Sequence, residues 1–178
     1  MTEPRHFAFW PKDVPRSLAV PQTNLFYNAE VSATRYPDRP YLLWYDTPVT
    51  FAEFRDECER LAGFLEKECG VRHGDRVLLY LQNSPQFVVG YYAILRANAV
   101  VVPVNPMNLT TELRHYVADS GARVAIVGQE LHPQVQPLLG QGLDRVVVAA
   151  YSDYLRRASS RKSSYGVTVT LTWSYEAV

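Results

Sequence analysis

The sequence predicts an α/β fold in which helices flank a largely parallel sheet. Segments with helical periodicity alternate with short apolar runs along most of the chain, which is the order typical of βαβ units. The run at residues 99–102 is apolar on both faces, the pattern of a strand covered from both sides. With 178 residues, of which 47% are hydrophobic and 20% charged, the chain is long and apolar enough to fold around a core.

The first region, residues 1–22, is predicted to be an extended arm. Its four prolines are Pro4, Pro11, Pro15 and Pro21, and its three aromatic residues are Phe7, Phe9 and Trp10. Prolines at this density exclude a helix. Aromatic side chains in such an arm indicate that it packs on something, either its own domain or a partner chain.

The second region, residues 23–150, is predicted to be the α/β core. Its first helix begins at Thr23 or Asn24 as the cap and runs to about Arg35, before a proline-flanked turn at residues 37–40. A short strand at residues 41–45, a turn at 46–48 and a return strand at Val49 follow.

The next helix begins at Thr50, which with Glu53 has the spacing of a capping box. Its predicted buried stripe consists of Phe51, Phe54, Cys58, Leu61, Ala62 and Leu65. Gly70 ends this helix, and a turn at residues 73–75 leads into a strand at 77–81.

The most informative block is residues 82–106. Ser84 is suited to cap a helix and Pro85 to occupy its first position, and Gly90 within this helix is expected to allow close packing. The expected strand at residues 99–102 follows this helix. Further expected elements are a helix at 110–120, a strand at 123–127, a weak helix at 129–139 and a strand at 145–149.

The third region, residues 151–178, differs in composition. Residues 156–164 form a basic, serine-rich stretch that is interpreted as a solvated loop, with an anion-binding or regulatory role as the alternative. Alternating apolar residues at 167–173 predict an edge strand. We expect the domain to continue beyond the end of this chain.

The global properties exclude several classes of protein. Eighteen basic and eighteen acidic residues give zero net charge, which argues against a nucleic-acid binder. The most apolar window, residues 87–104, is interrupted by Arg96, Asn98 and Pro103, so no transmembrane segment is expected. Cys58 and Cys69 are roughly 16 Å apart along one predicted helix, too far to form a disulfide, and this favours a reducing, cytoplasmic location.

No residue pattern in the chain predicts a catalytic, cofactor-binding or metal site. The histidines His6, His73, His115 and His132 have no metal-ligand spacing. The carboxylate pairs Asp56/Glu57 and Glu66/Glu68 are expected on a solvated helix face. Ser84 lacks the glycine elbow of a nucleophile, and the only close glycine pair, Gly140 and Gly142, lacks the third glycine of a dinucleotide loop.

A series of segments carries a family resemblance through its order and spacing. The segments are Phe9-Trp10-Pro11-Lys12, Leu25-Phe26, residues 35–40, 50–54 and 70–77, the block at 82–106, and residues 112–122. Together they resemble the N-terminal part of the adenylate-forming acyl-CoA synthetases, the AMP-binding family, and within it the bacterial long-chain fatty-acid–CoA ligases. The resemblance implies that the fold is an incomplete portion of the large N-terminal domain of these ligases.

The resemblance also implies a function for the parent protein. A fatty acid is adenylated by ATP with magnesium, pyrophosphate leaves, and coenzyme A captures the acyl-adenylate. The family's phosphate loop lies beyond Val178, so we expect an N-terminal fragment that is inactive alone and binds no cofactor. In the intact fold, the helix at residues 85–97 and the turn at 104–106 are expected to build scaffold near the acyl side. The alternative is a non-catalytic interaction or oligomerisation module with this fold. Because truncation would leave apolar sheet surface exposed, we also expect homo-oligomers through the N-terminal arm or the exposed sheet.

Overall fold

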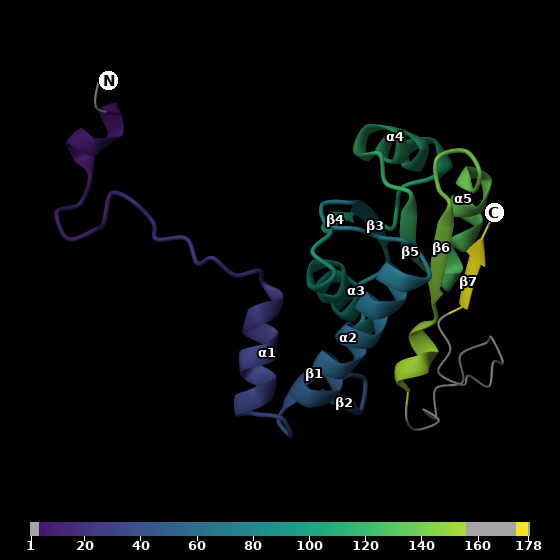
Figure 1. Cartoon of the computed structure of the whole chain (residues 1–178), viewed down its shortest axis with the longest axis horizontal. Helices are drawn as coiled ribbons and strands as arrows, with labels where there is room; N and C mark the ends of the chain where they lie inside the picture. Colours follow the sequence, from purple (N-terminus) through teal and green to yellow (C-terminus); the bar gives the residue numbers. More distant parts are fainter. Residues whose placement is uncertain (1–3, 156–173, 178) are drawn as a thin grey trace.

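A five-stranded sheet lies at the centre of the computed structural model, which describes residues 4–155 and 174–177 (Figure 1). The strand order is β4-β3-β5-β6-β7. The bounds are β3 (Arg76–Tyr80), β4 (Val100–Pro103), β5 (Val124–Gly128), β6 (Arg145–Ala149) and β7 (Ser174–Ala177). The first four strands of this order are parallel to one another, and β7 is antiparallel to β6. The predicted α/β class with a largely parallel sheet is confirmed.

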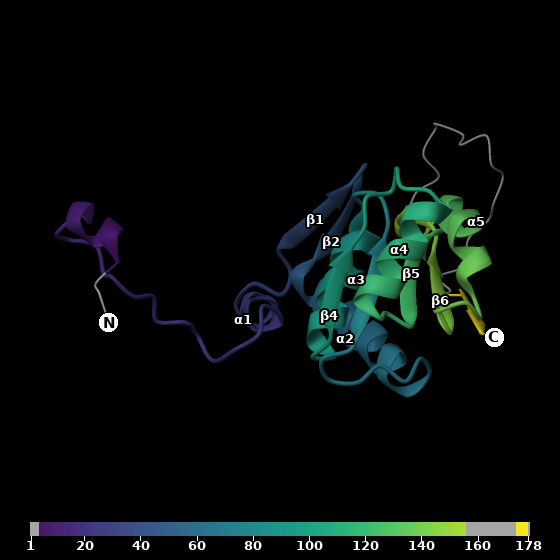
Figure 2. The ribbon, with the colours of Figure 1, turned by 90° about the horizontal axis from the view of Figure 1, so that it is seen from above.

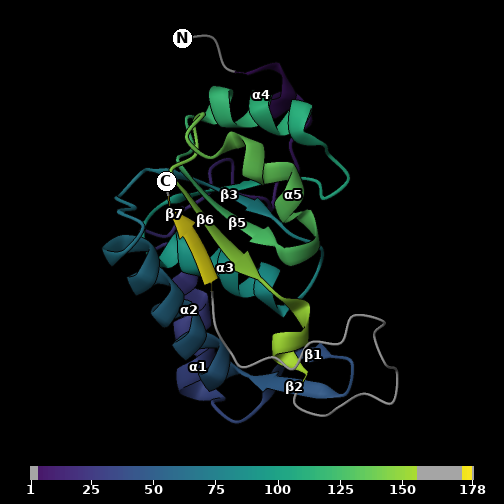
Figure 3. The ribbon, with the colours of Figure 1, turned by 90° about the vertical axis from the view of Figure 1, so that its right-hand side faces the viewer.

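Helices cover both faces of this sheet (Figure 3). On one face lie α2 (Phe51–Lys67) and α3 (Pro85–Arg96), with α1 (Phe26–Arg35) packed against these two helices. On the other face lie α4 (Thr110–Ser120) and α5 (His132–Val135). Successive residues of the central strand β3 alternate between the two cores: Val77 and Leu79 contact the α1–α3 side, and Leu78 and Tyr80 the α4–α5 side. All four are at most 1% exposed, which explains the continuous apolar run of this strand.

The connections of the sheet reverse direction once. From β3 the chain passes through α3 to β4 on one side, and from β4 it passes through α4 across to β5 on the other side of β3. The helices of these two crossovers lie on opposite faces, so both connections keep the same hand. The reversal places a topological switch point between the carboxyl ends of β3 and β5, where ligands of open α/β sheets commonly bind.

Local signals position the helices as predicted. Thr50 Oγ1 accepts from the amide of Glu53 and the Glu53 carboxylate accepts from the amide of Thr50, which completes the capping box of α2. The predicted stripe is confirmed at Phe54, Cys58, Leu61, Ala62 and Leu65, all of which are buried, whereas Phe51 is half-buried. Asn24 Oδ1 accepts a hydrogen bond from the Tyr27 amide at 3.2 Å, so the Asn24 side chain satisfies one backbone amide in the first turn of α1.

A hairpin separate from the main sheet connects α1 to α2. It consists of β1 (Pro40–Trp44) and β2 (Thr47–Thr50), which pair antiparallel. The strand, turn and return strand were all predicted, but β2 begins at Thr47 rather than at Val49.

Strand β4 corrects one prediction. The sequence suggested a strand covered on both sides, but β4 is the edge of the sheet and Val100 is 47% exposed. The backbone amides of Val100 and Val104 donate to the carbonyls of Asp75 and Leu79. The backbone nitrogens of the alternate residues, Val101 and Pro103, therefore point away from β3. Pro103 has no amide hydrogen, and a proline within a strand is a feature of edge strands. The sequence therefore contained the signal for an edge.

Two further predictions need correction. A 3₁₀ helix at Arg5–Phe9 lies within the arm, because the interval between Pro4 and Pro11 is long enough for one short turn. The weak helix expected at 129–139 is divided into 3₁₀, α and 3₁₀ segments at Gln129–Leu131, His132–Val135 and Gln136–Leu138. The prolines at 133 and 137 cannot donate the hydrogen bonds of one continuous helix.

The C-terminal predictions can be tested only in part. The basic stretch at 156–164 and the strand expected at 167–173 lie outside the described residues. Strand β7 follows them at Ser174–Ala177. In the part of the chain that the structure describes, no helix combines the length and the apolar character needed to cross a bilayer.

Candidate functional site

A pocket of about 310 Å³ lies at the carboxyl ends of β3 and β4. The pocket is formed by the loop after β3, the first turn of α3 and the turn after β4, nearly all within the block at residues 82–106. Its lining residues are Leu81, Gln82, Asn83, Phe87, Pro103, Val104, Asn105 and Pro106. The walls are therefore apolar with three amide side chains, and no lining residue carries a charge.

Short-range hydrogen bonds position these walls. Ser84 Oγ accepts from the Phe87 amide at 3.2 Å, which fixes the start of α3 beside the loop. The Val104 amide donates to the Leu79 carbonyl at 2.9 Å, and Asn105 Oδ1 accepts from the Met107 amide at 2.9 Å. The predicted capping role of Ser84 is confirmed, and the side chain is only 7% exposed.

Next to this pocket, Tyr151 bridges the loops at the switch point between β3 and β5. Its hydroxyl accepts from the Gln82 amide at 2.9 Å and donates to Glu130 Oε1 at 2.8 Å. These contacts join the loops after β3, β5 and β6 at one edge of the sheet. Burial raises the pKa of Tyr151, and Glu130 raises it further although the Gln82 amide opposes the shift, so the phenol stays protonated and acts as a fixed bridge.

Polar groups without partners surround the short helix Tyr151–Tyr154. Gln86 is 1% exposed; its Nε2 donates to the Ala150 carbonyl at 2.5 Å, but its Oε1 has no partner. Trp44 Nε1 and Asp153 Oδ1 are likewise buried without a hydrogen bond. Burial raises the pKa of Asp153 to about 6, because a carboxylate loses hydration without gaining a donor.

The chemistry of this region is limited by its residue types. The pocket can accommodate an apolar or neutral group and hydrogen-bond it through amides. No arginine or lysine lines it to balance a triphosphate, and the described residues contain no group of three or more metal-ligating side chains. The pocket residues therefore do not fit ATP, magnesium or the phosphates of coenzyme A, and we derive no catalytic step from them.

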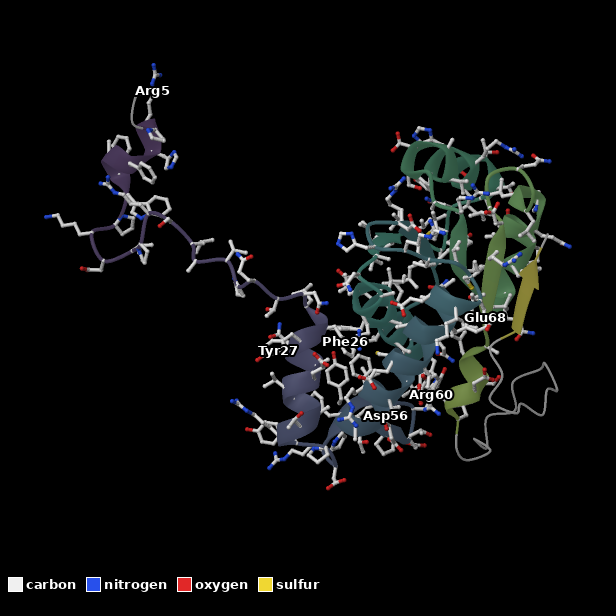
Figure 4. All side chains as sticks on the ribbon, viewed as in Figure 1. Arg5, Phe26, Tyr27, Asp56, Arg60 and Glu68 are labelled. Carbon is white, nitrogen blue, oxygen red and sulfur yellow. The ribbon has the colours of Figure 1, made fainter. Side chains whose placement is uncertain are left out.

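The structure places the other sequence candidates apart from this pocket. His73 and His115 are exposed, and Asp56, Glu66 and Glu68 lie on the outer side of α2, where Asp56 and Glu68 are visible in Figure 4. Glu57 differs from the expectation of a solvated carboxylate. It is half-buried and accepts a hydrogen bond from the hydroxyl of Tyr154.

Sequence reasoning missed Tyr151, Glu130 and Gln82 as a cluster. A signal existed, since polar residues that follow parallel strands converge on the same edge of a sheet. Gln82 follows β3, Glu130 follows β5 and Tyr151 follows β6. The order of the strands decides that these three ends are adjacent, and pattern analysis does not provide that order.

Comparison with known proteins adds the family. The family profile described as "AMP-binding enzyme" matches residues 29–171, which is most of the chain. The chain belongs to the AMP-binding family. Members of this family among its relatives include the long-chain-fatty-acid–CoA ligase of Bacillus subtilis, which is 32% identical over 149 residues, or 83% of this chain. The Salmonella typhimurium protein of the same name is 32% identical over 151 residues, or 84% of this chain.

Solved structures of AMP-binding enzymes share the fold. A long-chain-fatty-acid-CoA ligase from Archaeoglobus fulgidus superposes with a TM-score of 0.66 and 27% identity over 80% of this chain and 31% of that one. An anthranilate CoA ligase superposes with a TM-score of 0.68 and 26% identity over 75% of this chain and 27% of that one. The predicted family and fold are thus confirmed.

The chain spans about a quarter of the length of the curated relatives that it matches: 26% of the Bacillus protein and 27% of the Salmonella protein. Membership of an adenylate-forming family describes the fold and ancestry of these residues.

Proposed function

We propose that this chain is the N-terminal part of an ATP-dependent fatty-acyl-CoA ligase. The observation that carries the proposal is the 32% identity to long-chain-fatty-acid–CoA ligases over more than four fifths of the chain. In the proposed reaction, a carboxylate oxygen of the fatty acid attacks the α-phosphorus of ATP and pyrophosphate leaves. The thiolate of coenzyme A then attacks the acyl carbon, the bond to AMP breaks, and acyl-CoA and AMP are released.

Within this reaction the described residues act as scaffold. The α3 helix and the turn after β4 form an uncharged wall, which suits an apolar acyl group better than a nucleotide. We propose that ATP, magnesium and coenzyme A are held by other parts of a longer polypeptide. The 178-residue chain alone is then inactive.

Titration calorimetry of the 178-residue chain with MgATP and with coenzyme A tests this division of roles. We expect no binding heat up to millimolar ligand. Micromolar affinity for ATP would contradict the scaffold role. Sequencing the gene past the codon for Val178 tests the ancestry separately, and we expect an in-frame Thr/Ser/Gly-rich loop within a few dozen codons.

A second candidate function is that of a non-catalytic interaction module. The observation that favours it is the arm, which presents exposed apolar side chains away from the body. A stop codon directly after Val178 in an expressed gene would favour this candidate over the ligase.

A cytoplasmic location accompanies both candidates. Cys58 and Cys69 are free thiols. Burial raises the pKa of Cys69 to about 11 and that of Cys58 as well, so both stay protonated at neutral pH. Two unpaired thiols support a reducing compartment.

A further inference from the structure

The short helix η4 (Tyr151–Tyr154) joins several parts of the molecule. Figures 1 and 3 show it directly after β6, beside the β1/β2 hairpin. Its first residue, Tyr151, bonds the loops after β3 and β5, and the hydroxyl of its last residue, Tyr154, donates to Glu57 of α2. Just before it, the Ala150 carbonyl accepts from Gln86 Nε2 of α3 at 2.5 Å. A movement of η4 would therefore break contacts with α2, α3 and two strand ends together.

Two hydrogen-bond acceptors beside this helix have no donor. Gln86 Oε1 and Asp153 Oδ1 are both buried without a partner. They belong to residues that are held by one carbonyl, because the Asp153 amide donates to Ala150 at 3.1 Å, as Gln86 Nε2 also does. An ionised carboxylate only accepts hydrogen bonds, whereas a protonated carboxyl also donates one. A proton on Asp153 therefore supplies the donor that Gln86 Oε1 lacks.

The charges around η4 also favour the protonated carboxyl. The charged side chains that hydrogen-bond this helix are both acidic: Glu57 on α2 and Glu130 after β5. Gln86 and Trp44, which face it from α3 and the hairpin, are neutral. The basic residues of the arm lie beyond α1, on the opposite side of the body from β6 (Figure 2). Within the described residues no ion pair involves Asp153, and burial raises its pKa to about 6.

Trp44 provides the competing arrangement. Its Nε1 is a buried donor without a hydrogen bond, and the centroid of its ring lies 6.4 Å from that of Tyr151. A bond from Nε1 to the Asp153 carboxylate would stabilise the charged form, which is the opposite of the effect expected from Gln86. The Gln86 arrangement is favoured, because Gln86 and Asp153 are held by the same carbonyl, whereas Trp44 contacts η4 at Tyr151.

We propose that Asp153 and Gln86 form a proton-operated latch on η4. When the Asp153 carboxyl is protonated, it donates to Gln86 Oε1 and holds η4 against α3. When this proton leaves to water, both acceptors lack a donor, η4 separates from α3, and the bond between Tyr151 and the Gln82 amide opens with it. The latch thereby links pH to the mobility of the loop after β3, which lines the pocket. The inference is independent of which molecule the pocket binds.

Native-state amide hydrogen exchange of the 178-residue chain tests the latch through the Gln82 amide, which donates to Tyr151. Protection factors at about pH 4 and about pH 7 are compared, because they exclude the intrinsic pH dependence of exchange. We expect the protection factor of Gln82 to fall about tenfold from the lower to the higher pH, since the closed form binds the proton of Asp153 more tightly than the open form.

Two variants show whether Asp153 causes this fall. Asp153→Asn keeps an amide donor at the position, so protection at Gln82 is expected to be the same at both pH values. Glu130→Gln is the matched control, since Glu130 is the other carboxyl on the Tyr151 bridge, and the tenfold fall should persist in it. Constant protection in the unsubstituted chain, or an undiminished fall in Asp153→Asn, overturns the proposal.

Urea distinguishes local opening of η4 from unfolding of the whole chain. Low concentrations of urea should reduce protection at Leu79, in the centre of the sheet, but not at Gln82, because a local opening exposes little surface. Equal dependence on urea at both amides would mean that η4 opens only in global unfolding, and the latch would be refuted.

An NMR titration of the Asp153 carboxyl identifies its partner. Gln86→Met removes the acceptor with a side chain of similar shape, so the pKa of Asp153 is expected to fall from about 6. Trp44→Phe is the matched control and should leave this pKa unchanged. An unchanged pKa in Gln86→Met contradicts the pairing, and a rise in Trp44→Phe would assign the Asp153 carboxylate to Trp44 instead.

Discussion

At the scale of residues, two glycines show where close approach decides the amino acid. A Cβ on Gly90 would lie 2.9 Å from Leu79 Cδ1, so α3 could not pack as closely on β3. A Cβ on Gly128 would lie 2.6 Å from the Tyr151 hydroxyl, and would therefore disturb the hydrogen bond from this hydroxyl to Glu130. The sequence predicted the first as a packing position because Gly90 lies in an apolar helix. The close approach at Gly128 depends on Tyr151, 23 positions later in the sequence, and was not predicted.

Tyr151→Phe tests the bridge. We expect the free energy of unfolding to fall by about 1 kcal/mol, because the substitution removes two hydrogen bonds whose remaining groups, on Gln82 and Glu130, can reach water. Tyr27→Phe is the control, since Tyr27 is 49% exposed on α1 and its hydroxyl loss should change stability by less than about 0.5 kcal/mol. Urea denaturation measures both, and equal effects would mean that the bridge contributes nothing.

Asp153 gives a pH dependence with a defined sign. Its pKa is raised to about 6 in the folded protein from 3.8, so the folded state binds the proton more tightly and stability falls as pH rises from about 4 to 6. Asp153→Asn should therefore stabilise the protein at pH 7–8, by about 1 kcal/mol once solvent screening of this half-buried group is allowed for. The gain should vanish near pH 4. Thermal denaturation at the two pH values measures it, and a gain that is independent of pH would assign the effect to another cause.

At the scale of elements, local chemistry predicted the helices better than the role of the strands. The capping box at Thr50 and the cap at Ser84 involve residues three positions apart, so the sequence contains both partners of each bond. Strand β4 was expected to be covered on both sides because its four residues are apolar. Whether a strand is central or at an edge depends on pairing with distant segments, and here only Pro103 indicated the edge.

Amide hydrogen exchange followed by NMR tests the assignment of β4 as an edge. The Val101 amide faces away from β3 and should exchange quickly, whereas Leu79 in the central strand β3 should exchange slowly. The Val102 amide, which points toward β3, is the control within the same strand. Slow exchange at Val101 would show that another strand covers this edge.

At the scale of the whole molecule, the chain combines a three-layer body with a projecting arm. The body buries apolar residues on both faces of its sheet, and Figure 3 shows the helices that cover them. The arm buries nothing, although its composition of prolines and aromatic residues resembles that of a packing segment. Phe9 in this arm is 89% exposed, whereas Phe7 and Trp10 contact each other.

The sequence by itself determined the fold class, the helix starts, the packing role of Gly90 and the family, since these depend on residues close together or on patterns repeated along the chain. The tertiary structure decided that β4 is an edge, that Tyr151 joins three strand ends, and that the two ends of the block at 82–106 meet in one uncharged pocket. The physical reason is the order of the strands. Side chains far apart in sequence become neighbours only when the parallel strands that carry them are adjacent.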